Sequence, residues 1–430
     1  MDDTRTTDEP TDPSRQQAQA MDFLVQLGAA LIQAGTAVDE VHQTLVLAAV
    51  ELGIDDSSVV VLPTVVLLQA RGATGNRNRM TSFRRNGMRL DQITLLDDLT
   101  KDAVRGRVTA DDGLRRLRDI RRARPPMPKL VRVFGMGVLS TGFSLLLQPT
   151  PAGVGLAFAL GLVVGALRVV DLPQFQVVLP VVATFGVSIA VFTFAAHYDA
   201  ENPIRMLIPP LVLFLPGAAL TIGTMELAAG DTVSGASRLV EGVVQLLLLA
   251  FGIVAAAQVV DVPQSELIDN PIESFGWLTP LLGLVVLTLG HYLHNCAPRR
   301  TVGWIFVVCA AAFAGQTGGA ALVAPELSGF FGAVVMTPLI LWLSGRPDGP
   351  PRMTLFLPAF WMLVPGATGL IGITQAVGVT SIVASDFGET AVTVASITLG
   401  TLIGAATWTA GNDMASYALE HLTGRGADRD

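Results

Sequence analysis

Long apolar runs separated by short polar connections dominate the chain from about residue 131 onward. Ten of these runs approach or exceed the roughly 20 residues that an α-helix needs to cross a bilayer. The runs predict membrane-spanning helices at 131–149, 152–170, 174–196, 204–228, 236–260, 275–293, 300–323, 326–344, 353–376 and 390–416. Because the number of spans is even, both ends of the chain are predicted to lie on the same side of the membrane.

Before the first apolar run the pattern changes to amphipathic helices and β-branched strand segments. Apolar residues recur at helical spacing over 21–52, with a break near Gly35 and Thr36 that predicts two helices. A strand is predicted over 58–70, with Pro63 at a bulge or edge, followed by a turn and a return strand. Two further helices complete a small α/β domain of roughly one hundred residues.

These patterns divide the chain into five parts. Residues 1–20 are polar and lack the apolar core of a signal peptide, so they predict a disordered tail. The predicted parts are the tail 1–20, a cytoplasmic α/β domain 21–130, a first transmembrane repeat 131–260, a second transmembrane repeat 261–420 and a cytoplasmic tail 421–430.

Composition supports a membrane protein and indicates its orientation. The chain is 51% hydrophobic and 15% charged, whereas a soluble protein is about 25% charged. From Val133 onward it has nine arginines, no lysine and 18 acidic residues. With the N-terminal domain in the cytoplasm, the connections and tail on that side contain every one of these arginines except Arg205, as the positive-inside rule requires.

One apolar segment with an internal break occurs twice. Residues 208–223 align with residues 357–372 at an offset of 149, and six of the sixteen positions are identical. The two segments belong to the fourth and ninth predicted spans, so they run in opposite directions across the bilayer. The sequence therefore predicts an α-helical polytopic membrane protein of about ten spans in two inverted five-helix repeats, with an N-terminal cytoplasmic α/β domain.

The duplicated break is the first candidate site. Pro216 and Gly217 align with Pro365 and Gly366. Paired Pro/Gly breaks in corresponding spans mark where transporters open their helices and offer backbone groups to a substrate. We therefore assign these four residues to substrate binding; simple proline kinks are the alternative.

Charged residues at membrane depth form the second candidate site. Glu226, Asp231 and Arg238 cluster at the end of the fourth span and the start of the fifth, and Asp413 lies near the end of the tenth. A carboxylate that changes protonation can couple transport to protons, and an arginine can bind a substrate carboxylate. We assign Glu226, Asp231 and Asp413 to proton coupling and Arg238 to substrate binding; solvated loop charges are the alternative.

The sequence gives little indication of metal binding, nucleic-acid binding or catalysis. His291 and His294 have metal-ligand spacing but no third ligand in the sequence, which favours an interfacial pair, and Arg168 with Asp171 also indicates an interfacial pair. The arginines within 115–132 suit anionic lipid rather than nucleic acid. The sequence has no catalytic triad, phosphate-binding loop or ATP-binding domain, so we expect no enzyme activity, metal or cofactor.

Several of these segments resemble one known family. LIQAGTAVDEVHQTLVLAAVELGI (31–54) and, above all, LPGAALTIGTMELAAGDTVSGASRLVEG (215–242) are similar to the threonine/serine exporters. The resemblance implies efflux of small hydroxy amino acids across the bacterial cytoplasmic (inner) membrane, driven by the proton motive force. Split two-protein members are linked to export of dicarboxylates such as succinate. The positions that match the family pattern are Pro216, Gly217, Asp231, Gly235 and Arg238, and Gly35 and Glu40 of the N-terminal domain match it without an assigned role.

The predicted partners are a small-molecule substrate (threonine, serine or a small dicarboxylate), protons and the lipid bilayer. Three other functions stay open: a passive channel, a membrane-tethered enzyme whose N-terminal domain is catalytic, and a sensor whose N-terminal domain binds a metabolite. A homo-oligomer is compatible with the sequence, which does not specify the oligomeric state.

Overall fold

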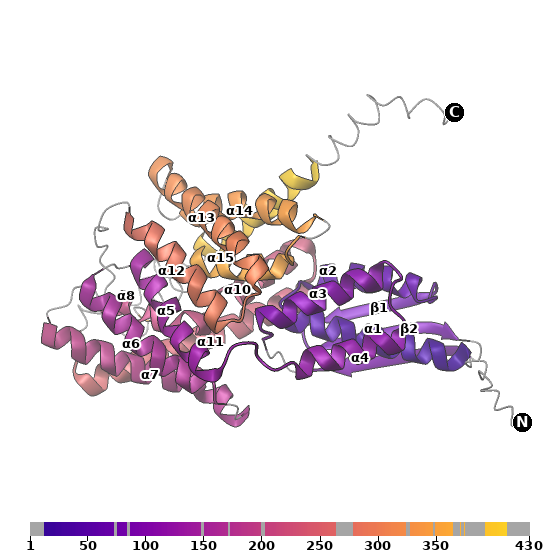
Figure 1. Cartoon of the computed structure of the whole chain (residues 1–430), viewed down its shortest axis with the longest axis horizontal. Helices are drawn as coiled ribbons and strands as arrows, with labels where there is room; N and C mark the ends of the chain where they lie inside the picture. Colours follow the sequence, from indigo (N-terminus) through magenta and orange to yellow (C-terminus); the bar gives the residue numbers. More distant parts are fainter. Residues whose placement is uncertain are drawn as a thin grey trace, which may run out of the picture. The chain divides into compact units, whose positions relative to one another are not determined.

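The structure is a computed structural model that divides the chain into two compact units, and Figure 1 labels many of their elements. The N-terminal unit comprises Met1–Met88 and Gln92–Arg124, and the helical unit comprises Arg89–Asp91 and Pro125–Asp430. The described residues are 13–72, 75–83, 87–147, 150–170, 173–198, 203–263, 278–323, 327–346, 349–363, 370, 374 and 392–410.

The N-terminal unit packs helices against a small antiparallel sheet. Its elements are α1 (Pro13–Gln33), α2 (Val38–Glu51), β1 (Ser57–Leu62), β2 (Val65–Gly72), β3 (Gly75–Ser82), α3 (Leu90–Val104) and α4 (Ala110–Arg122). The strands pair in the order β1-β2-β3. Helix α1 is central, because it contacts α2, α4, β2 and β3, while α2 contacts β1. Phe23, Leu27, Leu45 and Leu68 are fully buried in the resulting core.

The hairpin corrects the single strand that was predicted over 58–70. Leu62 pairs with Val65, so the chain turns back at Pro63 and Thr64 and forms two strands. Proline has no N–H to donate to a strand ladder, which explains why the strand ends there rather than passing through a bulge. The return strand β3 then pairs with β2.

The predicted tail is also too long, because α1 begins at Pro13 rather than near residue 21. Proline suits the first turn of a helix, where its missing N–H needs no partner. Two long-range hydrogen bonds hold this first part of α1: Gln17 donates to the carbonyl of Arg71 over 2.7 Å, and Arg77 donates to the carbonyl of Ser14 over 2.6 Å.

The helical unit contains the apolar segments. Its elements are α5 (Lys129–Leu147), α6 (Pro151–Arg168), α7 (Pro173–Tyr198), α8 (Pro203–Met206), α9 (Ile208–Leu211), the 3-10 helix η1 (Val212–Phe214), α10 (Gly217–Ala229), α11 (Thr232–Val260), α12 (Leu278–His294), α13 (Arg299–Leu322), α14 (Ser328–Ser344) and α15 (Arg352–Leu363). The last described helix is Val392–Ala410. This is the arrangement of a polytopic membrane protein.

The described residues contain six helices long and apolar enough to cross a membrane, or seven if one bent pair forms a single span. The six are α5, α6, Val178–His197 of α7, α11, α13 and Val392–Ala410. Helices α12 and α14 have 17 residues each and α15 has 12, so they fall short of the usual length. The ten-span count and the inverted repeat therefore stay predictions.

Glycines allow the helices of this unit to pack closely. A Cβ atom on Gly142 of α5 would lie 2.5 Å from the backbone nitrogen of Leu287 in α12. A Cβ atom on Gly290 of α12 would lie 2.5 Å from the Cα of Leu139 in α5. Small residues at such positions let backbones approach and gain van der Waals contact, the main source of helix association in lipid.

The Phe23→Ala substitution should destabilise the N-terminal unit by about 3–5 kcal/mol, because it empties a fully buried aromatic site. The measurement is hydrogen exchange of the β2 amides in the full-length purified protein. Met80→Ala is the matched control, since Met80 is 66% exposed on β3. Equal exchange rates in the two variants would contradict this description of the core.

Candidate functional site

The helical unit has a sharp break within one membrane-length segment. The segments Pro203–Phe214 and Gly217–Ala228 are together long and apolar enough to cross a membrane once. Their axes meet at a bend of 66°. At the bend Leu215 is extended, with φ −69° and ψ 127°, as expected for a residue before proline. Proline alone does not cause such a bend, because Pro180 lies inside the continuous helix α7. The bend follows from a Pro-Gly pair that comes directly after a short 3-10 turn.

The break exposes the start of helix α10 within this span. Pro216 is the N-cap residue and supplies no side-chain hydrogen bond to the first turn. The first amides of a helix have no acceptor within the helix and carry the positive end of its dipole. Gly217, the first residue of α10, is buried, and Pro216 is half-buried. The start of α10 can therefore bind an anionic group.

At its other end α10 turns directly into α11. Gly230 adopts the left-handed conformation with φ 96°, which favours glycine and allows the tight turn. The next residue, Asp231, is the N-cap of α11, and its amide donates to the carbonyl of Glu226 over 2.8 Å. The Asp231 side chain is half-buried and forms no capping hydrogen bond.

A buried ion pair joins these two helices. Arg238 Nε donates to Glu226 Oε2 over 2.9 Å, and the two side chains are 0% and 2% exposed. The sequence left open whether these charges belong to a solvated loop, and the structure buries both of them. Each charge is costly alone in a low-dielectric interior and is stabilised by the other.

Two glycines bring the partners together. A Cβ atom on Gly223 would lie 2.9 Å from the carbonyl oxygen of Gly235, and one on Gly235 would lie 2.5 Å from that of Gly223. No side chain fits between the backbones of α10 and α11 here. This close approach explains why the buried pair on α10 and α11 can form.

The break and the ion pair are separate centres on one helix. Glu226 follows Gly217 by nine positions, which at a rise of 1.5 Å per residue is about 14 Å along α10. One threonine-sized molecule cannot contact both ends. The structure therefore brings together Glu226, Arg238 and the backbone of Asp231, but not Arg238 with Pro216 and Gly217.

Of the two candidate pairs identified in the sequence, the histidine pair is placed differently from expectation, and Asp171, the predicted partner of Arg168, lies outside the described residues. His291 and His294 are 0% and 4% exposed, so they lie between helices rather than on an open helix surface. His294 Nδ1 donates to the carbonyl of Arg132 over 2.8 Å, and His291 stacks on Trp361 with ring centroids 5.4 Å apart. Among the residues that the structure describes, no three metal-ligating side chains gather. The sequence did not reveal that neighbouring helices bury these two histidines.

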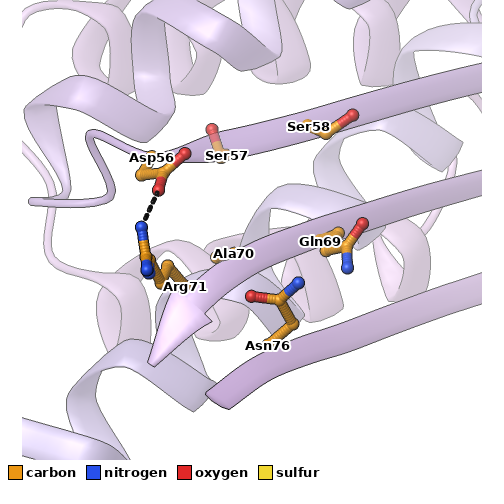
Figure 2. Close-up of a pocket in the computed structure, with 7 residues that line it drawn as sticks. All are labelled: Asp56, Ser57, Ser58, Gln69, Ala70, Arg71 and Asn76. Carbon is orange, nitrogen blue, oxygen red and sulfur yellow. Dashed lines mark ion pairs between the residues drawn. The ribbon is translucent and has the colours of Figure 1, made fainter. Parts of the chain in front are cut away.

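The N-terminal unit has a polar hollow of about 370 Å³ on its sheet (Figure 2). The lining residues are Asp56, Ser57, Ser58, Gln69, Ala70, Arg71 and Asn76. Arg71 and Asp56 approach within 3.8 Å, but both side chains are 77% exposed. Such an open ion pair is largely screened by water and adds little energy. This hollow is a weaker candidate than the buried centres.

Three predicted site residues lie outside the described residues. They are Pro365, Gly366 and Asp413. Of the segment aligned with the break, α15 carries the earlier proline, Pro358, and contacts α10.

A family model described as "Putative threonine/serine exporter" matches residues 22–260. The match covers more than half of the chain and includes the break, the ion pair and the whole of α11. The chain belongs to the threonine/serine exporter family. This family contains transporters rather than enzymes, and its members act on a small-molecule substrate at a membrane.

A further relative of this exporter-family chain is an uncharacterised protein of the fission yeast Schizosaccharomyces pombe. The two are 28% identical over 185 residues, which cover 38% of this chain and 21% of the yeast protein. The chain therefore matches about a fifth of that relative's length. No solved structure matches the chain significantly.

Replacing one partner of the ion pair should cost far more stability than replacing both. Glu226→Gln or Arg238→Gln leaves a buried charge uncompensated, which costs about 3–5 kcal/mol, whereas the double variant removes both charges. The measurement is the thermal unfolding temperature of the purified full-length protein.

Glu241→Gln is the matched control, because Glu241 is an exposed acid on the same helix α11. A double variant less stable than both single variants would contradict the pairing.

Proposed function

We propose that the protein is a secondary-active exporter of small polar metabolites, with threonine and serine as substrates and the proton motive force as driving force. Membership of the exporter family supports the substrate class. The observation that carries the proposal is the 66° break within a membrane-length segment. In hydrocarbon such a break is stable only where it is buried in protein or lines a polar cavity.

The substrate site in this proposal lies at the break. The free amides at the start of α10 bind the amino-acid carboxylate, while Pro216 and Gly217 keep the helix open there. Pro365 and Gly366 supply the corresponding break in an inverted second repeat. The contact between α10 and α15 supports this assignment, because α15 leads into the second break.

The proton site in this proposal is Glu226, with Asp231 and Asp413 as further carboxylates. Arg238 stabilises the ionised form of Glu226 across the 2.9 Å contact. Protonation of Glu226 would cancel this attraction and loosen α10 from α11. Because α10 links Glu226 to the break, loosening it can change access to the substrate about 14 Å away. Arg238 thus acts on the substrate through α10 rather than as a direct ligand.

The topology that goes with this function has ten spans and both termini in the cytoplasm, in the bacterial inner membrane. The arginine distribution supports the orientation. Helices α12 and α14 are one turn or less below the usual length for a span, and a thin or locally deformed bilayer accommodates such helices.

Transport is tested in inverted membrane vesicles with an imposed pH gradient. We expect labelled threonine and serine to accumulate, with saturation and with loss of accumulation when a protonophore collapses the gradient. Accumulation of succinate alone would redirect the assignment to dicarboxylates. Flux without saturation or proton dependence would instead favour a passive channel and would contradict the proposal.

The role of the break is tested by Pro216→Ala. Alanine restores a backbone donor and favours a continuous helix, so threonine transport should fall at least about tenfold, a change of roughly 1.4 kcal/mol in barrier height. Pro180→Ala is the matched control, because Pro180 lies inside the unbroken helix α7. The measurement is initial uptake rate per folded protein, and equal rates for the two variants would exclude a special role for the break.

A further inference from the structure

Arg168, at the end of α6, is half-buried, and one nitrogen of its guanidinium is fully buried. Its Cζ lies 5.5 Å from the centroid of the Phe214 ring. Its Nη1 is buried and has no hydrogen-bond partner among the residues that the structure describes. A cation at a helix C-terminus is favoured by the dipole, but the dipole does not supply an acceptor for a buried N–H group.

The surroundings of Arg168 contain further positive charge. The ends of α5 and α6 that carry Arg132 and Arg168 pack closely, since a Cβ atom on Gly165 would lie 3.0 Å from the carbonyl oxygen of Val133. His294 Nδ1 donates to the Arg132 carbonyl over 2.8 Å. The Nε atom of Arg132 is also buried without a hydrogen-bond partner in the described part of the chain. Among the described residues no acidic side chain forms an ion pair with either arginine, and Asp171, the partner predicted for Arg168, lies outside them. Two like charges at neighbouring half-buried positions repel each other, and an anion between them would offset that repulsion.

His291 of α12 adds a neutral hydrogen-bond donor to this region. Asn295 Nδ2 donates to His291 Nδ1 over 2.8 Å, which leaves the ring proton on Nε2. This Nε2 is buried on a fully buried side chain and lacks an acceptor among the described residues. His291 precedes His294 by one helical turn, so it extends the group of buried donors along α12.

These donors adjoin the break in the fourth predicted span. Phe214, beneath the Arg168 guanidinium, precedes Gly217 by three residues, and α6 contacts α9 just before the break. The free amides of α10 and the Arg168 guanidinium therefore belong to neighbouring segments. A planar guanidinium with free N–H groups next to helix amides suits a carboxylate.

We propose that Arg168, supported by Arg132, binds the carboxylate of the exported amino acid at the start of α10. This inference rests on the proposed transport function and names the side chain that recognises the substrate class. The cytoplasmic orientation expected for this end of α5 and α6 suits an exporter, because the substrate is then captured from the cytoplasm.

The experiment compares Arg168→Gln and Arg168→Lys with the wild type in vesicles and as purified full-length protein. Loss of a charge-assisted contact should raise the KM for threonine by about 10- to 100-fold, with a smaller change in kcat and an intermediate effect for Lys.

Arg346→Gln is the matched control. Arg346 also lies over an aromatic ring near the end of a helix, 3.8 Å from the Trp342 centroid, but it is exposed. Its KM should stay within about twofold of the wild-type value.

A second arm uses the wild-type protein and does not depend on folding of a variant. Unlabelled threonine should displace bound labelled threonine, whereas threoninol, which lacks the carboxylate, should fail to do so. Displacement by threoninol as effective as that by threonine would overturn the inference.

A third arm compares phosphatidylcholine vesicles with vesicles that also contain phosphatidylglycerol. A rise in threonine KM with the anionic lipid, abolished by Arg168→Gln, would assign the site to a lipid phosphate and overturn the inference.

Failure of this inference and failure of the transport function have different signatures. If the wild type transports threonine and the folded Arg168→Gln variant has the same KM, only the inference is overturned. Absence of wild-type transport, together with Arg168-dependent threonine binding, overturns the transport function and leaves the carboxylate site. Absence of both overturns both.

Discussion

The need to satisfy every backbone polar group in hydrocarbon governs this structure. Helices α5, α6, α7, α11 and α13 meet that need within themselves, and glycines let them pack closely. The segment that contains Leu215, Pro216 and Gly217 does not, because its helix stops and restarts at 66°. Its open backbone groups require partners from protein, water or a ligand.

Around this break, the helical unit places fully and partly buried charges in two arrangements. Glu226 and Arg238 satisfy each other across the closest approach of α10 and α11. Arg168 and Arg132 gather positive charge without an acidic partner among the described residues. The carboxylate of an ion pair can take up or release a proton, whereas a cationic group without an acidic partner can bind an anion. The break lies beside the second centre and is joined to the first by α10.

The N-terminal unit follows the packing rules of an ordinary globular fold. Its sheet and helices bury one apolar core around Phe23 and Leu68, and its polar hollow is open. Arginines of α4 form ion pairs with acids of the same unit, as Arg116 does with Asp102 over 2.8 Å. These charges are therefore partly neutralised within the unit, so fewer are left to interact with lipid than the sequence count indicates.

The sequence by itself determined the order of apolar segments, the place of the break and the family. These features depend on local composition, such as a run of apolar residues or a Pro-Gly pair. It also predicted two helices before the hairpin, at 13–33 and 38–51 in the structure. It misplaced the turn at Pro63, because β-branched residues on both sides of the proline look like one strand.

Only the tertiary structure decided which charged residues are buried and what they contact. Glu226 and Arg238 are separated by 12 residues, and His294 and the Arg132 carbonyl by 162. Each contact depends on how two helices pack, and the same residue types could equally well lie on a solvent-exposed surface. The burial of a side chain depends on which distant residues pack against it, and the local sequence does not identify those residues.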